Sequence, residues 1–219
     1  MKVGIIIYHK NIFDIYKPDW VQKCLDSIRN QTYQKFVVYE LCYSTNRQQL
    51  WPGSEYSHIP MSNHICSMNH LIDKAFLDDC NVVANINLDD HFHPERLQLQ
   101  LDAVQEGYDL ISSNFEHIEE INGIDTHVRD MIFHDRDIKK ELNEGHNVLA
   151  HPVIMMTKHF WDTYKYYDDT QLGYEDKSLW TKAINDGCKI KIVDKILLHY
   201  RLSENQTGRV YNSQGIKTK

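Results

Sequence analysis

The sequence predicts an α/β fold in which helices flank a mostly parallel central sheet. Two observations carry this prediction: short apolar runs rich in β-branched residues, and amphipathic helical patterns that separate those runs in the first half of the chain. Strands that alternate with helices favour parallel pairing through right-handed crossovers. The 219 residues, of which 42% are hydrophobic and 25% charged, suit one globular domain with a sizeable core.

The first quarter of the chain predicts a strand, a helix, a second strand and a loop. Residues 3–8, VGIIIY, form an apolar β-branched run that is typical of a buried central strand. After a polar turn, Pro18 opens a helix whose apolar residues follow helical spacing. Residues 36–42 predict the second strand, and residues 47–60 lack periodicity and are expected to form a surface loop.

The second quarter predicts two more helices and two more strands. An amphipathic pattern over residues 65–76 indicates a helix, with Ser62 or Asn63 as its N-cap. Residues 82–86 are apolar enough for a strand that is buried on both faces. A helix over about residues 94–106, closed by a glycine, and a strand over residues 108–114 are expected to follow.

The second half of the chain is less regular. Residues 115–149 are polar and rich in His and Asp, and they predict an excursion that faces a partner. Residues 151–156 indicate a strand, and a helix that follows Gly173 and ends at Gly187 comes next. The last strands are expected at residues 189–193 and 196–200, before a polar and mobile tail at residues 201–219.

Charge and cysteine content exclude several classes of protein. The chain carries 24 Lys and Arg against 31 Asp and Glu, a formal charge of -7, which argues against a nucleic-acid partner. Its five cysteines are odd in number and have no CxxC spacing, so reduced thiols and a cytoplasmic location are expected. No signal peptide precedes the first strand, and no run approaches the length of a membrane span.

An abrupt acidic turn follows the buried run at residues 82–86. Asn87, Asp89 and Asp90 fall at the carboxyl end of this predicted strand, where ligands bind in open α/β sheets. Two adjacent carboxylates there are costly unless a cation holds them, and a divalent metal with a phosphorylated substrate meets that need. The alternative interpretation is a solvated acidic turn without a ligand.

Four motifs in the right order give the chain a family resemblance. They are VGIIIYHKN, the helical Ser67-Met68-Asn69, NLDDHFHPERL, and GYEDKSLWTKAINDGCKIKIVDKILLHYRLSENQTG. Together they resemble family 2 glycosyltransferases with the GT-A fold, over residues 3 to about 208. The resemblance implies a single Rossmann-like domain over residues 1–219, with a nucleotide-sugar half at about 1–115, an acceptor half at about 116–200 and the tail at 201–219.

This resemblance implies a metal-dependent glycosyltransferase of the hexosyltransferase type. Sugar would pass with inversion from a nucleotide-sugar donor, with a UDP-sugar favoured, to a hydroxyl of a glycan or other acceptor. Mn²⁺ or Mg²⁺ would be the cofactor. Part of the tail, with Arg201, Ser203 and Asn205, would close over the donor. The implied site residues are Asp176 as general base and Glu175 beside it, Asp89 and His199 on the metal, and Tyr8, His9, Glu40, Asn69, Asn87 and Arg201 on the donor.

Two departures from the family pattern concern the donor. Glu40 stands where the family places an Asp that contacts the base, so base recognition can differ. Asn87 replaces the first Asp of the Asp-x-Asp motif and is a poorer metal ligand, which leaves Asp89 as the matching carboxylate.

Other interpretations of these residues remain open. Asp176 can be a plain carboxylate at a helix N-terminus, His199 a structural histidine at a strand end, and Arg201 the partner of a surface acid. A metal-dependent hydrolase built on Asp89, Asp90, His91 and His93 is a second function, since these ligand types suit a metal. A sugar-binding relative without activity is a third.

Overall fold

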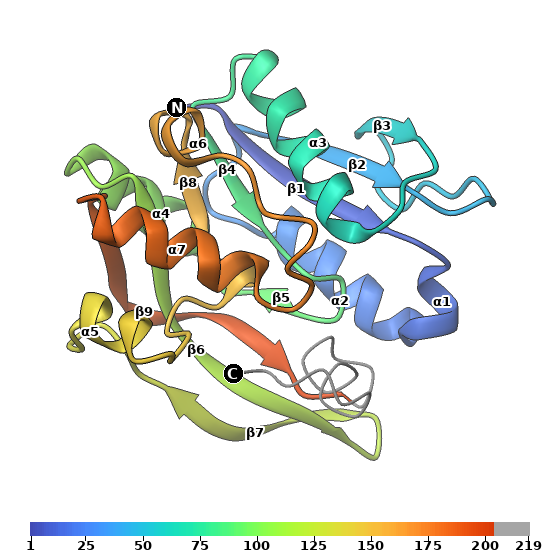
Figure 1. Ribbon diagram of the computed structural model, residues 1–219. Helices are drawn as coiled ribbons and strands as arrows, with labels where there is room; N and C mark the ends of the chain where they lie inside the picture. Colours follow the sequence, from blue (N-terminus) through green and yellow to red (C-terminus); the bar gives the residue numbers. More distant parts are fainter. Residues whose placement is uncertain (204–219) are drawn as a thin grey trace.

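A nine-stranded mixed sheet runs through the protein, and helices cover both of its faces (Figure 1). The computed structural model describes residues 1–203. The strands are β1 (Val3–His9), β2 (Phe36–Cys42), β3 (Glu55–His58), β4 (Val82–Asn85), β5 (His91–Phe92), β6 (Leu110–Ile121), β7 (Ile124–Met131), β8 (Met155–Thr157) and β9 (Ile190–Arg201). The helices are α1 (Ile12–Ile15), α2 (Pro18–Arg29), α3 (His64–Leu77), α4 (Arg96–Gln105), α5 (Ile138–Asn143), the 3₁₀ turn η1 (His151–Val153), α6 (Lys158–Tyr164) and α7 (Glu175–Asn185).

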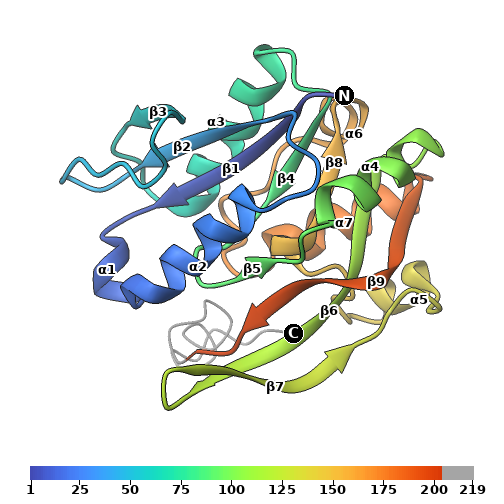
Figure 2. The same ribbon diagram turned by 180° about the vertical axis from the view of Figure 1, so that it is seen from behind.

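The strand order is β3-β2-β1-β4-β8-β6-β9-β5, with β7 paired to β6. The predicted parallel arrangement is confirmed for β3, β2, β1 and β4, and for the pair β6 and β9. β8 pairs antiparallel with β4 and with β6 and so joins the two parallel parts of the sheet. Helices α3, α6 and α7 lie on one face of the sheet, and α2 and α4 lie on the other (Figures 1 and 2).

The parallel part of the sheet is built as the sequence predicts. The run at β1 is almost fully buried because apolar β-branched residues fill both of its faces. Helix α3 begins at Asn63, whose side chain accepts from the main-chain N–H of Cys66 and so caps the first turn. Gly4 allows α3 to approach β1, since a Cβ there would lie 3.0 Å from the Cβ of Ala75.

Residues 115–149 contain regular elements that the sequence did not predict, and the partner-facing role stays a prediction. Strand β6 continues to Ile121, and β7 returns beside it, so the region is an antiparallel hairpin followed by α5. Asn122 and Gly123 both have positive φ, 53° and 79°, as a two-residue hairpin turn requires. The polar composition hid this hairpin because most residues of β7 are exposed.

Smaller corrections concern four other segments. The strand expected at 151–156 is the turn η1 followed by the short β8, because Pro152 favours a helical turn over a strand. The expected loop at 47–60 contains the edge strand β3, and α1 follows β1 without a clear sequence signal. The two strands expected at 189–200 are one strand, β9, whose register against β6 shifts between Val193 and Ile196.

The expected mobile tail lies mostly outside the described residues. Arg201 ends β9, and Leu202 and Ser203 follow it, whereas residues 204–219, including Asn205, are not described. The proposed closure of this tail over a donor therefore stays a prediction. Over residues 1–203, no helix has both the length and the apolar character that crossing a membrane requires.

Candidate active site

A cleft of about 720 Å³ opens at the carboxyl ends of the parallel strands β1, β2 and β4. This is the edge where open α/β sheets bind ligands, because the loops that follow parallel strands converge there. Six of the residues singled out in the sequence line the cleft together. They are Tyr8, His9, Asn87, Asp89, Glu175 and Asp176.

The hairpin and the last strand form the opposite wall. Side chains alternate across a sheet, so residues in register on neighbouring strands share a face. His117 of β6 is in register with Arg129 of β7 and with Tyr200 of β9, and all three line the cleft. The polar region that the sequence left without a structure therefore supplies one side of the site.

The two aspartates of the acidic turn are placed differently. Asp89 lines the cleft with 5% of its surface exposed, and burial raises the pKa of its carboxyl to about 6 although Arg201 opposes the shift. Asp90 lies beneath the cleft, where its Oδ1 accepts from the main-chain N–H of Arg201 at 2.8 Å. Burial, and then the charge of Asp89, raise the pKa of Asp90 well above its usual value. Asp89 is thus the carboxylate that a ligand in the cleft can reach.

The Glu-Asp pair opens α7 and faces the cleft from the other side. Asn147 donates to Oδ2 of Asp176 at 2.9 Å, and the main-chain N–H of Lys177 donates to Oδ1. Burial, and then the charge of Glu175, raise the pKa of Asp176 to about 6. Burial alone would raise the pKa of Glu175, but the hydrogen bond with His64, a main-chain hydrogen bond and the charges of His64 and His151 together outweigh burial and lower that pKa.

These opposite shifts give the two neighbouring carboxyls different proton affinities. Environments that push two neighbouring pKa values apart mark an acid or base beside a group that stays ionised. Glu175 stays ionised, because His64 lies 3.4 Å from its Oε1 and the main-chain N–H of Gly173 donates to its Oε2. Asp176, with a pKa near neutrality, is suited to take and release a proton.

Glu40 lies one layer behind the cleft. It is fully buried, and its carboxylate accepts from the main-chain N–H groups of Leu50 and Trp51 and from the hydroxyl of Ser54. Its Oε1 also lies 3.0 Å from Nε2 of His9, which does line the cleft. Glu40 is therefore placed to fix the loop after β2 and the ring of His9.

Three other predicted residues also lie away from the cleft wall. Asn69 bonds the main chain of Tyr167 through both its Nδ2 and its Oδ1. His199 bonds Glu116 and stacks on His91 at a ring distance of 4.3 Å.

Arg201 is fully buried and donates from Nε to the main-chain oxygen of Asp89 and from Nη1 to Asp125. None of these three residues lines the cleft that contains Asp89 and Asp176.

The structure adds cleft residues that the sequence did not single out. His64 begins α3 and stacks on Tyr8, and Asn147 holds Asp176 from the loop after α5. His151 lines the cleft from η1, and burial lowers its pKa to about 4. Asn147 lies in a stretch without periodicity, and His151 begins the run that predicted a strand at 151–156, so the sequence marked neither as a site residue.

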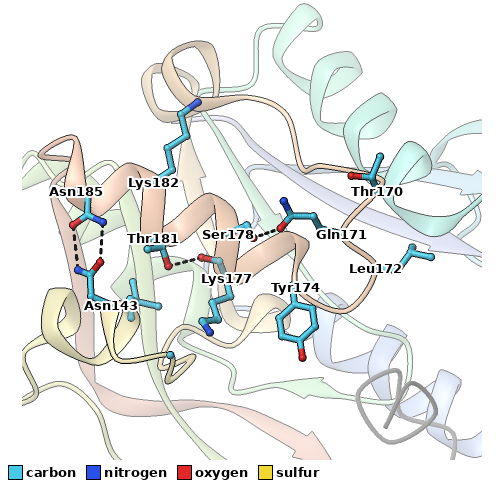
Figure 3. Close-up of a pocket in the computed structure, with 12 residues that line it drawn as sticks. Asn143, Thr170, Gln171, Leu172, Tyr174, Lys177, Ser178, Thr181, Lys182 and Asn185 are labelled. Atoms are coloured by element: carbon cyan, nitrogen blue, oxygen red, sulfur yellow. Dashed lines mark hydrogen bonds between the residues drawn. The ribbon is translucent and has the colours of Figure 1, made fainter. Parts of the chain in front are cut away.

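A larger pocket, of about 840 Å³, lies on the outer side of α7 (Figure 3). Its residues come mainly from α5, α7 and the segment before α7, and the amides of Asn143 and Asn185 bond each other across it. None of the predicted site residues lines this pocket. The smaller cleft is therefore the candidate active site, because the titratable groups with shifted pKa values converge there.

Comparisons with solved structures identify the fold. The chain superimposes on S. aureus TarS with a TM-score of 0.67 at 16% identity, over 93% of this chain and 37% of that one. It also matches TarS 1–349 in complex with UDP, with a TM-score of 0.68 at 17% identity over 93% and 61% of the two chains. For the complex with UDP-GlcNAc the TM-score is 0.70 at 16% identity, over 95% and 60%.

This likeness shows the GT-A fold that the motifs indicated. The chain spans between about a third and two thirds of the length of these TarS structures. No protein-family model matches the sequence, and no curated protein matches it.

Proposed function

We propose that the protein is a glycosyltransferase that moves a sugar from a nucleotide-sugar, with a UDP-sugar favoured, to an acceptor hydroxyl with inversion. The observation that carries the proposal is that Asp89 and Asp176 line one cleft from two separate elements, the turn after β4 and the start of α7. One carboxylate is thereby available for a metal-bound leaving group and the other for the acceptor proton. The complexes of TarS with UDP and UDP-GlcNAc support the choice of donor.

The charge of the cleft supports a divalent cation as cofactor. Asp89, Glu175 and Asp176 line it and outnumber its two basic side chains, Lys10 and Arg129, so a bound cation would offset the excess negative charge that opposes a diphosphate. Burial raises the pKa of Asp89 because the ionised carboxylate loses solvation, and a bound cation would offset that loss. Mg²⁺ and Mn²⁺ bind through one or two carboxylates together with phosphate oxygens, so Asp89 fits such an ion. When bound, the ion would offset the charge that develops on the leaving diphosphate.

In this proposal Asp176 takes the proton of the acceptor hydroxyl as the new glycosidic bond forms. Its pKa of about 6 leaves it mostly ionised at neutral pH, and yet basic enough to accept a proton. Asn147 fixes one carboxylate oxygen through its hydrogen bond, which leaves the base in a defined orientation. Glu175, held by His64 and Gly173, keeps a negative charge beside the base and so maintains its raised pKa.

The arrangement does not favour the hydrolase interpretation. A hydrolase would need Asp89, Asp90, His91 and His93 around one metal ion, but of these four only Asp89 lines the cleft. His91 stacks on His199, and Nδ1 of His93 accepts from the main-chain N–H of Glu95. The four side chains therefore make different contacts and do not surround a single metal site.

Calorimetry with UDP tests the proposed donor and metal together. We expect UDP to bind in the presence of Mn²⁺ and to lose most of its affinity in excess EDTA, because the acidic cleft then repels the diphosphate. Asp89→Asn should reduce the Mn²⁺-dependent affinity, and Asp186→Asn, an exposed change at the far end of α7, should leave it unchanged. Equal UDP affinity with Mn²⁺ and with EDTA would overturn the metal-dependent donor site.

A further inference from the structure

A row of titratable side chains crosses the sheet on the face opposite the cleft. Glu116 of β6 is in register with Asp130 of β7 on one side and with His199 of β9 on the other. The neighbouring row, which contains His117, points into the cleft. Because side chains alternate along a strand, the Glu116 row points away from the cleft.

A bulge in the hairpin adds His127 to this row. His117 pairs with Arg129, but Ile118 pairs with His127, so Val128 is an extra residue in β7. In an unbroken register His127 would share the cleft face with Arg129. The one-residue shift turns it to the face of Glu116 instead.

The side-chain atoms of this group lie close enough to share one ion. Nε2 of His127 lies 2.8 Å from Oδ1 of Asp130 and 3.7 Å from Oε2 of Glu116. The ligand atoms of these three residues all lie within 4.8 Å of one another. On the other side of Glu116, Oε1 is bonded to Nδ1 of His199.

We propose that Glu116, His127 and Asp130 form a binding site for one divalent cation of the zinc type, with His199 holding the carboxylate of Glu116 in place. One imidazole and two carboxylates provide three of the four nitrogen and oxygen ligands that Zn²⁺ accepts in a tetrahedral site, and water takes the fourth position. Imidazole ligands disfavour Mg²⁺ and Ca²⁺, so this site differs in selectivity from the carboxylate of Asp89. The ion would neutralise two carboxylates that lie side by side on one face of the sheet.

The surroundings hold the three ligands in place. They lie on β6 and β7, which are hydrogen-bonded to each other, and His199 lies on β9 at the other side of β6. The ring of His199 is supported from the β5 side by the stacked ring of His91. Glu116 and His199 are mostly buried, with 19% and 26% of their side chains exposed, whereas His127 and Asp130 are about half exposed and leave a path for the ion. A bound ion would fasten β7, which carries Arg129 on its cleft face, to β6.

Titration of the tag-free protein with Zn²⁺, in the absence of nucleotide, tests the site. We expect saturable binding of one ion, visible by calorimetry and, with Co²⁺ as a spectroscopic substitute, as the visible absorption of a four-coordinate ion. His127→Ala should weaken the affinity by at least roughly 10- to 100-fold, the loss typical of groups that support a metal site. Asp130→Asn is the second variant, and both residues are exposed enough to be replaced without loss of the fold.

Two controls separate this site from other histidines and from the cleft. His146→Ala removes an exposed histidine that pairs with Glu141, so it matches His127 in exposure but lies outside the row. We expect it to leave the Zn²⁺ affinity unchanged, as should Asp89→Asn. The absence of saturable Zn²⁺ binding, or affinity unaffected by both His127→Ala and Asp130→Asn, would overturn the site. Binding that is lost only in Asp89→Asn would place the ion in the cleft and also overturn it.

Discussion

Arg201 and Asp125 form an ion pair of 2.6 Å in which the arginine side chain is fully buried. The pair fastens the end of β9 to the start of β7, near the turn of the hairpin that forms one wall of the cleft. The same arginine holds the turn with Asp89 and Asp90 and packs over the ring of Trp20 at 4.7 Å. One residue therefore positions the acidic turn relative to both the hairpin and α2.

The first prediction follows from this contact. Arg201→Ala should lower the free energy of unfolding by about 3–5 kcal/mol, the usual loss when one partner of a buried pair is removed. Arg136→Ala, which breaks an exposed pair with Glu141, should cost about 0–1 kcal/mol. Urea unfolding of both variants measures the difference. Similar losses in the two variants would contradict the bracing role of Arg201.

The sequence could not reveal this role of Arg201. It predicted an arginine on the donor or paired with a surface acid, but the partners Asp89 and Asp125 lie 112 and 76 positions away along the chain. Such pairings depend on the tertiary arrangement of β9, the hairpin and the acidic turn. By contrast, the strands β1, β2 and β4 were predictable because apolar residues dominate each of them, although β2 also carries Glu40.

The sequence predicted those site residues that lie at the end of a recognisable strand or at the start of a recognisable helix. Asp89 follows a buried strand and Asp176 opens a helix, and both local patterns recur in the structure. The hairpin wall was missed because β7 is largely exposed and lacks an apolar face, although the Asn122-Gly123 pair is a turn signal. Asn147 could not be found from sequence, since its function depends on the packing of the loop against α7.

A second prediction concerns Glu40. Glu40→Ala would leave the partly buried N–H groups of Leu50 and Trp51 without an acceptor and should destabilise the fold by about 1–3 kcal/mol. Glu40→Gln keeps an acceptor oxygen and should cost less. Glu55→Ala, on the neighbouring edge strand with an exposed side chain, is the control. If thermal unfolding gives Glu40→Ala and Glu55→Ala the same loss of stability, Glu40 does not hold the loop after β2 in place.

A third prediction is a pH dependence of turnover. Because the pKa of Asp176 is about 6, kcat should fall as the pH decreases through 6, where the base becomes protonated. Saturating Mn²⁺ keeps Asp89 ionised, since a bound cation favours the carboxylate form, so the remaining acid limb belongs to Asp176. The measurement is kcat between pH 5 and 8 at saturating donor and metal. A flat profile over this range would rule out a base with this pKa.

A fourth prediction concerns the pH dependence of stability. Turnover falls as the pH decreases, whereas the stabilising contribution of Asp176 falls as the pH increases. The folded-state pKa of Asp176 lies above its ordinary value of 3.8, so the folded protein binds this proton more tightly than the unfolded chain does. That contribution to stability is present below pH 3.8 and is lost as the pH rises through 6. Asp176→Asn should therefore be more stable than the parent at pH 8, and the difference should shrink below pH 6. Unfolding curves at both pH values provide the test, and a variant less stable at pH 8 would contradict it.

In the proposed transfer, Asp176 is the base and the donor is held elsewhere in the same cleft. The most direct test measures transfer from UDP-GlcNAc, the ligand of the similar TarS structure, together with UDP affinity in folded Asp176→Asn. We expect transfer to fall by roughly 10²- to 10⁴-fold while UDP affinity is retained, because the change removes a proton acceptor and leaves the donor site intact. Full transfer by the folded variant would exclude Asp176 as the base.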